Sequence, residues 1–91
     1  MVYIVCFDLI QPGQKFDQLL QLIKQDGKWA RLGRTAYLID SESSAVELRD
    51  RFKVALDGND KIYVGHVSTP AAWTGMSDGV SQWIKNKLNH E

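Results

Sequence analysis

The chain has 91 residues, of which 44% are hydrophobic and 24% are charged, a composition typical of one small globular domain. Eleven basic residues balance eleven acidic ones, so no overall charge directs the chain to nucleic acid or to an anionic membrane. We expect a cytoplasmic protein, because no apolar run approaches the ~20 residues of a membrane-spanning helix and no signal peptide precedes the first strand.

The chain begins with an apolar run, residues 2–9, that contains a single carboxylate near its end. Both odd and even positions are apolar as far as Asp8, which predicts a strand buried on both faces. Cys6 lies within this strand, where a thiol behaves as a small hydrophobic side chain, and as the single cysteine it cannot form an internal disulfide. A turn is predicted over residues 11–14, since Pro12 and Gly13 favour turn dihedrals.

Further elements are predicted from hydrophobic periodicity, capping residues and turn residues. The first is a helix that begins at Lys15 and is capped by Gly27, and the second is a hairpin of strands 29–32 and 35–40 joined at Gly33-Arg34. A second helix then begins at the capping box Ser44–Glu47, and a fourth strand covers residues 61–68. After Pro70, residues 71–88 are predicted to form a C-terminal helical extension, although Gly75 and Gly79 weaken its first half.

The order of these elements is β-α-β-β-α-β with an additional C-terminal helix. It predicts one α+β domain over residues 1–91, with the ferredoxin-like arrangement and an antiparallel four-stranded sheet. Right-handed crossovers place the first and third strands in the centre and the other two at the edges. Two helices cover only one face of such a sheet. The other apolar face therefore needs the C-terminal helix or a second copy of the chain.

Asp8 is the first candidate for a functional residue. At the end of a central strand it would emerge at the rim of the sheet, and Mg²⁺ binds through one or two protein carboxylates while it keeps several waters. The Asp8 side chains of two copies could therefore share a metal ion. The alternative is that Asp8 accepts hydrogen bonds from the amides of the following loop, as Asp commonly does near turns.

A basic and aromatic group is the second candidate. Lys28, Arg31 and Arg34 surround the predicted edge hairpin together with Trp29. This group could bind nucleic acid through phosphate contacts and base stacking, or it could protect the edge strand by charge.

Other polar residues predict no catalytic device. Residues 57–60 lack the length and the terminal Glu of a calcium loop and are typical of a turn. His66 has no Cys, Ser or second His nearby in the sequence, and His90 lies in the tail.

With these features in place, the chain resembles the small CRISPR-associated adaptation nucleases, the Cas-two-like group, and more closely their compact SinR-like relatives. The matching segments are the strand end Val5–Leu9, the third strand Thr35–Ile39, the fourth-strand entry Asp60–Val64, and Ala72–Gly75 with Trp83-Ile84 near the C-terminus.

This resemblance implies a ferredoxin-like homodimer. In members reported as nucleases, the aspartates at the position of Asp8 meet around a divalent metal. The chain departs from these nucleases in two places. Residues 11–15 carry no arginine, and the segment after the fourth strand is predicted as a helix rather than as a strand that exchanges with the partner.

Three functions remain open. The first is a dimeric accessory or interaction protein. The second is a Mg²⁺-dependent endonuclease on RNA or DNA, in which two Asp8 carboxylates hold the metal and Arg31 or Arg34 steadies the phosphate. The third is a domain that binds a small ligand on its open sheet face.

Overall fold

The computed structural model describes residues 1–11 and 13–88. In chain order its elements are β1 (Val2–Asp8), α1 (Gly13–Lys24), β2 (Trp29–Gly33), β3 (Ala36–Asp40), α2 (Ala45–Lys53), β4 (Lys61–Val67) and α3 (Asp78–Leu88). The strands form one antiparallel sheet in the order β2-β3-β1-β4. The predicted α+β ferredoxin-like fold is confirmed, with β1 and β3 in the centre of the sheet.

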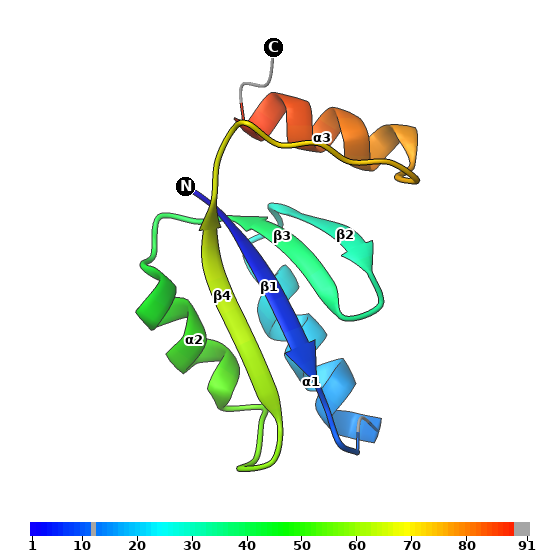
Figure 1. Cartoon of the computed structure of the whole chain (residues 1–91). Helices are drawn as coiled ribbons and strands as arrows, with labels where there is room; N and C mark the ends of the chain where they lie inside the picture. Colours follow the sequence, from blue (N-terminus) through cyan, green and yellow to red (C-terminus); the bar gives the residue numbers. More distant parts are fainter. Residues whose placement is uncertain (12, 89–91) are drawn as a thin grey trace.

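Helices α1 and α2 cover one face of the sheet (Figure 1). Side chains from both helices and from the two central strands form the main core on this side. They are Tyr3, Val5, Phe7, Leu19, Ile23, Tyr37, Ile39, Leu48, Phe52 and Ala55. Alternate residues of β1 point into this core, because successive side chains of a strand face opposite sides of the sheet.

Helix α3 lies across one end of the opposite face (Figure 1). Its residue Ile84 is 4% exposed and packs with Val2 and Leu38 in a second, smaller core. Lys87 Nζ lies 3.3 Å from Asp40 Oδ2, which adds an ion pair between α3 and the end of β3. Within the described residues, no helix is long and apolar enough to cross a membrane.

The segment after β4 is helical over less of its length than predicted. Residues 71–77 are not helical, and α3 begins at Asp78. Gly75 has φ +81°, which a helix does not allow, and Ser77 Oγ accepts a hydrogen bond from Val80 N at 3.2 Å in the manner of an N-cap. The non-helical segment is nevertheless attached to α3, because Trp73 Nε1 donates to Ser81 Oγ at 3.0 Å.

Two other boundaries differ slightly from the prediction. Helix α1 begins at Gly13 rather than at Lys15, so it includes half of the turn predicted over residues 11–14. Pro12 of that turn and His90 of the tail lie outside the described residues. The turn of the β2–β3 hairpin consists of Arg34-Thr35 rather than Gly33-Arg34.

The predicted capping box of α2 is confirmed. Glu47 N donates to Ser44 Oγ at 3.1 Å, and Ser44 N donates to Glu47 Oε1 at 2.9 Å. The start of α2 is therefore specified locally, by two residues three positions apart.

If α3 is an integral part of the domain, truncation of its buried side chain should be costly. We expect Ile84→Ala to lower the free energy of unfolding by about 2–4 kcal/mol, because it leaves a cavity against Val2 and Leu38. Urea denaturation measures the difference. Val46→Ala is the control, since Val46 is 55% exposed on α2, and we expect it to change stability by less than about 0.5 kcal/mol. Equal effects of the two substitutions would contradict the packing described for α3.

Candidate functional site

The part of the second sheet face beyond α3 carries small and aromatic side chains. The cross-strand register places Cys6 of β1 between Ala36 of β3 and Tyr63 of β4, and Gly65 follows on the same side of β4. Asp8 and Lys61 lie opposite each other at the rim. In the described part of the chain no helix covers this surface (Figure 1), which we call the open face.

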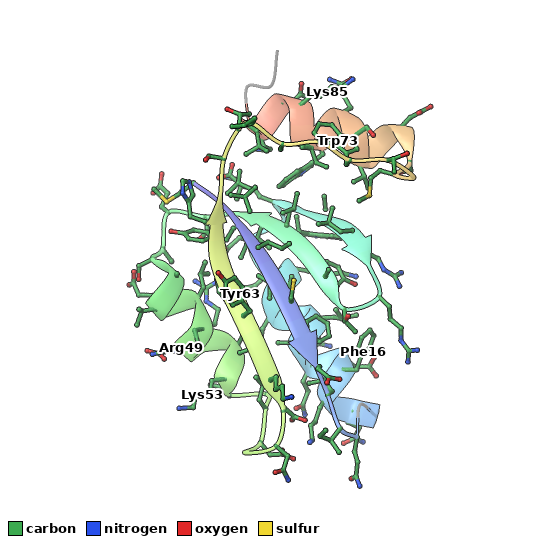
Figure 2. All side chains as sticks on the ribbon, viewed as in Figure 1. Phe16, Arg49, Lys53, Tyr63, Trp73 and Lys85 are labelled. Carbon is green, nitrogen blue, oxygen red and sulfur yellow. The ribbon has the colours of Figure 1, made fainter. Side chains whose placement is uncertain are left out.

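Tyr63 is the most prominent side chain of the open face. It is 67% exposed, and Figure 2 shows it on the near side of β4. Its ring lies beside Gly65, where an added Cβ atom would come within 2.7 Å of Tyr63 Cε1. Gly65 therefore leaves room for the ring to lie along the strand. The sequence analysis missed Tyr63, although a glycine two residues after an aromatic in a strand is a sign of such a close approach.

Asp8 is exposed at the end of β1, as predicted. It does not accept the hydrogen bond of the following loop. The amide of Ile10 instead donates to Asp60 Oδ1 at 3.0 Å. Among the described residues, the side chain of Asp8 forms no hydrogen bond or ion pair. The predicted turn role of Asp8 is therefore wrong for this structure, because Asp60, 52 positions further along the chain, performs it.

Asp60 is the centre of a polar network that holds this loop. Its side chain is buried, with 0% exposed, and it accepts hydrogen bonds from the amides of Asp57 and Ile10 at 3.0 Å each. These bonds, together with Lys15 Nζ at 3.1 Å, lower the pKa of Asp60 to about 2. Lys15 also pairs with Asp57, and both hydrogen bonds raise the pKa of Lys15.

The same network settles the structure of residues 57–60. Asn59 N donates to Asp57 Oδ1 at 3.0 Å, and Asp60 N donates to Asp57 O at 3.2 Å, as in a turn built by Asp side chains. The predicted turn is thus confirmed. The ammonium group that these carboxylates bind belongs to Lys15 of α1.

Asp8 and Arg34 line one cavity of about 250 Å³ together with Thr35. Phe7, Leu9 and Phe16 line it as well, and Figure 2 shows Phe16 beside the end of β1. The fold thus brings together two of the residues singled out from sequence, although 26 positions separate them. Within the described residues, the side chain of Arg34 forms no hydrogen bond or ion pair either.

Lys28 and Arg31 lie elsewhere. Lys28 and Arg34 are six residues apart at opposite ends of β2, which separates them by roughly 20 Å. Arg31 pairs in register with Tyr37, and its Nε donates to Gly33 O at 3.3 Å. The predicted basic group is therefore distributed over the hairpin rather than gathered on one surface.

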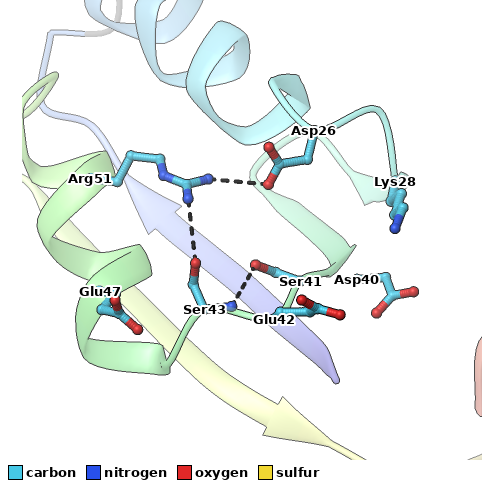
Figure 3. A pocket seen from close by; sticks show the side chains of 8 residues that line it. All are labelled: Asp26, Lys28, Asp40, Ser41, Glu42, Ser43, Glu47 and Arg51. Atoms are coloured by element: carbon cyan, nitrogen blue, oxygen red, sulfur yellow. Dashed lines mark hydrogen bonds and ion pairs between the residues drawn. The ribbon is translucent and has the colours of Figure 1, made fainter.

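Lys28 borders a different pocket, of about 590 Å³, at the other end of the sheet (Figure 3). Its lining residues are Asp26, Lys28, Asp40, Ser41, Glu42, Ser43, Glu47 and Arg51. Arg51 Nη1 pairs with Asp26 Oδ2 at 3.3 Å, so its charge is already compensated. Four carboxylates around two cations do not suit a phosphate group.

The described residues contain no group of three or more His, Cys, Asp or Glu side chains that could hold a metal ion. The predicted magnesium site takes its second carboxylate from the Asp8 of another copy, so it would form only between two chains. His66 is exposed on β4, and its ring lies near that of Tyr3, with centroids 6.2 Å apart in an edge-to-face arrangement.

The fold defines the class of the protein as a small α+β domain with the ferredoxin-like arrangement. The crystal structure of a hypothetical protein, TT1823 from Thermus thermophilus, is similar, with a TM-score of 0.66 over 82% of this chain and 90% of that chain at 22% sequence identity. A likeness at this identity shows the fold alone. No family model matches the chain, and no curated protein matches it.

The pKa of Asp60 predicts how acid affects stability. Because the pKa is about 2 in the fold against an ordinary 3.8, folding favours the ionised carboxylate. Its contribution is complete above about pH 5 and is lost progressively as the pH falls toward 2. We expect Asp60→Asn to be less stable than the wild type at pH 7 and to lose less of its stability between pH 4 and pH 2.

Urea denaturation at several pH values checks this expectation. Asp17→Asn, which removes an exposed carboxylate outside the network, is the matched control. If Asp60→Asn and wild type lose equal stability over this pH range, the assignment of Asp60 is wrong.

Proposed function

We propose that this protein is a homodimeric accessory protein of the Cas-two-like kind, which acts by binding rather than by catalysis. The observation that carries the proposal is the open face. It presents a 67% exposed tyrosine over a surface of small side chains, whereas α1, α2 and α3 pack on the rest of the sheet. Tyrosine is enriched in protein interfaces because it combines a large apolar ring with a hydrogen-bonding group.

A second copy of the chain suits the open face for electrostatic reasons. A two-fold symmetric interface brings the same patch of both subunits together, so the patch must complement itself. Asp8 and Lys61 place one charge of each sign at the rim of the open face. In an antiparallel contact, Asp8 of one copy can meet Lys61 of the other. The balanced overall charge also means that two copies do not repel each other.

The Cas-two-like character rests on the resemblance of the strand ends and is compatible with the fold. The ferredoxin-like sheet places Asp8 at the end of a central strand, where the resemblance implies it.

We also propose that the protein acts in the cytoplasm. Cys6 is a free, half-buried thiol on the open face, and a reducing compartment keeps such a thiol unmodified.

The dimer can be tested at Tyr63. We expect the wild type to be a dimer at micromolar concentration in sedimentation velocity, and Tyr63→Lys to shift it to the monomer, because the substitution places a charge in the centre of the contact. Val54→Lys is the control. Val54 is 83% exposed at the end of α2, away from the open face, so this variant should remain a dimer.

A wild-type monomer at these concentrations would refute the homodimer. A dimer that survives Tyr63→Lys would place the interface elsewhere on the molecule.

A specific observation also favours a second function, a Mg²⁺-dependent endonuclease. Asp8 and Arg34 line the same cavity, and neither charge is neutralised by a described residue. Two Asp8 carboxylates would hold the metal, and the bound metal would supply the positive charge that activates a water and stabilises the leaving oxygen of a phosphodiester. Arg34 is better placed than Arg31 to bind a phosphate oxygen, because the Arg31 side chain already donates a hydrogen bond to Gly33 O.

Incubation of single-stranded and double-stranded RNA and DNA with Mg²⁺ separates the two functions. If the protein is a nuclease, we expect Asp8→Asn to abolish cleavage, because an amide is a weak magnesium ligand, and Arg34→Gln to reduce it by about tenfold or more. EDTA should stop the reaction. Cleavage that persists in purified Asp8→Asn would remove Asp8 from the metal site, and no cleavage by the wild type would favour the accessory function.

A further inference from the structure

Strand β4 forms one edge of the sheet, and its outer side has no partner strand among residues 1–11 and 13–88. In that part of the chain β4 is paired with β1 alone. An edge strand directs the N–H and C=O groups of alternate residues outward, where they can form hydrogen bonds with an extended chain. A fifth strand can therefore join the sheet beside β4 (Figure 1).

The two edges of the sheet differ in how well they are protected. Strand β2, at the other edge, has five residues, and its register shifts between Arg31 and Gly33 as at a β-bulge. Strand β4 has seven residues, contains no proline, and pairs with β1 without interruption from Lys61 to Val67. Short strands and bulges protect sheet edges against further pairing. Because β4 has neither protection, it is the edge suited to binding.

A groove follows the edge of β4 on the side of the helices. Its volume is about 240 Å³, and its lining residues are Ala45, Val46, Arg49, Ile62, Tyr63 and Val64. Ile62 and Val64 pack against the main core but are only half-buried, and Val46 is 55% exposed. Helix α2 thus leaves apolar surface beside the edge, which the side chains of an added strand would cover.

The side of α2 that borders the groove is basic. Val46, Arg49 and Lys53 are spaced i, i+3 and i+7, which places them along one side of the helix, and Figure 2 shows Arg49 and Lys53 one turn apart. Arg49 pairs with its exposed neighbour Asp50 at 3.0 Å, and such a surface pair contributes little. Among the described residues, the side chain of Lys53 forms no ion pair. Both cations can therefore bind carboxylates of a partner.

We propose that the edge of β4 binds an extended, acidic segment of another protein as a fifth, antiparallel strand. Helix α2 and β4 run in opposite directions (Figure 1), so this segment runs in the same direction as α2. Every second side chain of the segment lies on the helix side, at intervals of about 7 Å. The steps from Val46 to Arg49 and from Arg49 to Lys53 are about 4.5 and 6 Å along the helix axis. One apolar and then two acidic residues, at alternate positions, complement these three side chains.

A second copy of the chain suits this edge less well than an acidic segment does. Two-fold pairing of β4 with β4 would bring the basic sides of two α2 helices together. The inference rests on the proposed accessory function, for which it names the class of partner, but it does not require the homodimer. The homodimer covers the open face of the sheet, whereas an added strand lies in the plane of the sheet.

The peptide acetyl-Thr-Val-Thr-Glu-Thr-Glu-Thr-amide has the required pattern and tests the proposal. Titration of the ¹⁵N-labelled protein, followed by two-dimensional ¹H–¹⁵N NMR, should give saturable shifts at the amides of residues 46–53 and 61–67. The same peptide with lysine in place of both glutamates meets Arg49 and Lys53 with like charges. It should bind at least about tenfold more weakly.

Two N-methylated forms of the acidic peptide test the strand pairing. One form carries its methyl groups on valine and the two glutamates, and the other carries them on the threonines. Alternate residues of a strand direct their N–H groups to opposite edges, so only one form loses the bonds to β4. We expect one form to bind as the parent peptide does and the other to bind at least about tenfold more weakly.

A matched pair of variants tests the role of α2. Lys53→Gln should weaken binding of the acidic peptide by about twofold to fivefold and should not weaken binding of the lysine peptide. Lys85→Gln removes another exposed lysine, on α3, and should bind the acidic peptide as the wild type does. Circular dichroism confirms that each variant is folded.

Absence of saturable binding of the acidic peptide at millimolar concentration to the folded wild type would overturn the proposal. Equal affinities for the acidic and lysine peptides, or for the two N-methylated forms, would also overturn it. Protection of the outward amides of β4 from hydrogen exchange in a dimer without peptide would assign the edge to a second copy instead. The homodimer is measured without peptide, so a monomeric wild type refutes the dimer and leaves peptide binding unaffected.

Discussion

The central strand β1 is apolar on both of its faces, and most of the architecture follows from the need to cover them. Val5 and Phe7 point into the core beneath α1 and α2, while Val2 and Cys6 point to the other side. A chain of this size has few elements with which to form a second layer. Helix α3 covers Val2 at one end of the second face, and the other end around Cys6 remains open.

The same strand sets the position of Asp8. Alternation along β1 directs its side chain toward the open face, and the end of the strand places it at the rim beside Lys61. Asp60, from the loop before β4, accepts the hydrogen bond that a turn aspartate at position 8 would otherwise accept. The carboxylate of Asp8 is thereby available for a partner at the rim of the open face, such as a second copy or a metal ion.

Several features could be predicted because they depend on residues close together in the chain. The capping box of Ser44 and Glu47 and the turn at Asp57–Asp60 are of this kind, and both are confirmed. The β-α-β-β-α-β order then predicted the strand order through the handedness of crossovers. The helix predicted over residues 71–88 was too long. The apolar residues Trp73 and Met76 fit the helical periodicity, but Gly75 between them adopts a positive φ that a helix does not allow.

The candidate site was less predictable than the fold. Proximity in sequence grouped Lys28 with Arg34, yet a strand of five residues separates them. The hairpin instead brings Arg34 to Asp8, through the hydrogen bond between Phe7 and Thr35. No local pattern in the sequence predicts that Asp60, rather than Asp8, accepts the hydrogen bond from the amide of Ile10, because this bond joins two loops 50 residues apart.

Periodicity, capping and turn residues therefore determine the elements and their order, since these depend on interactions within a few residues. The tertiary structure alone decides which charges meet, which half of the second sheet face α3 covers, and that Tyr63 lies exposed beside Gly65. These outcomes depend on cross-strand register and on packing between distant segments. A residue's neighbours in space, rather than those in the chain, decide whether its charge is already compensated or is free to bind a partner.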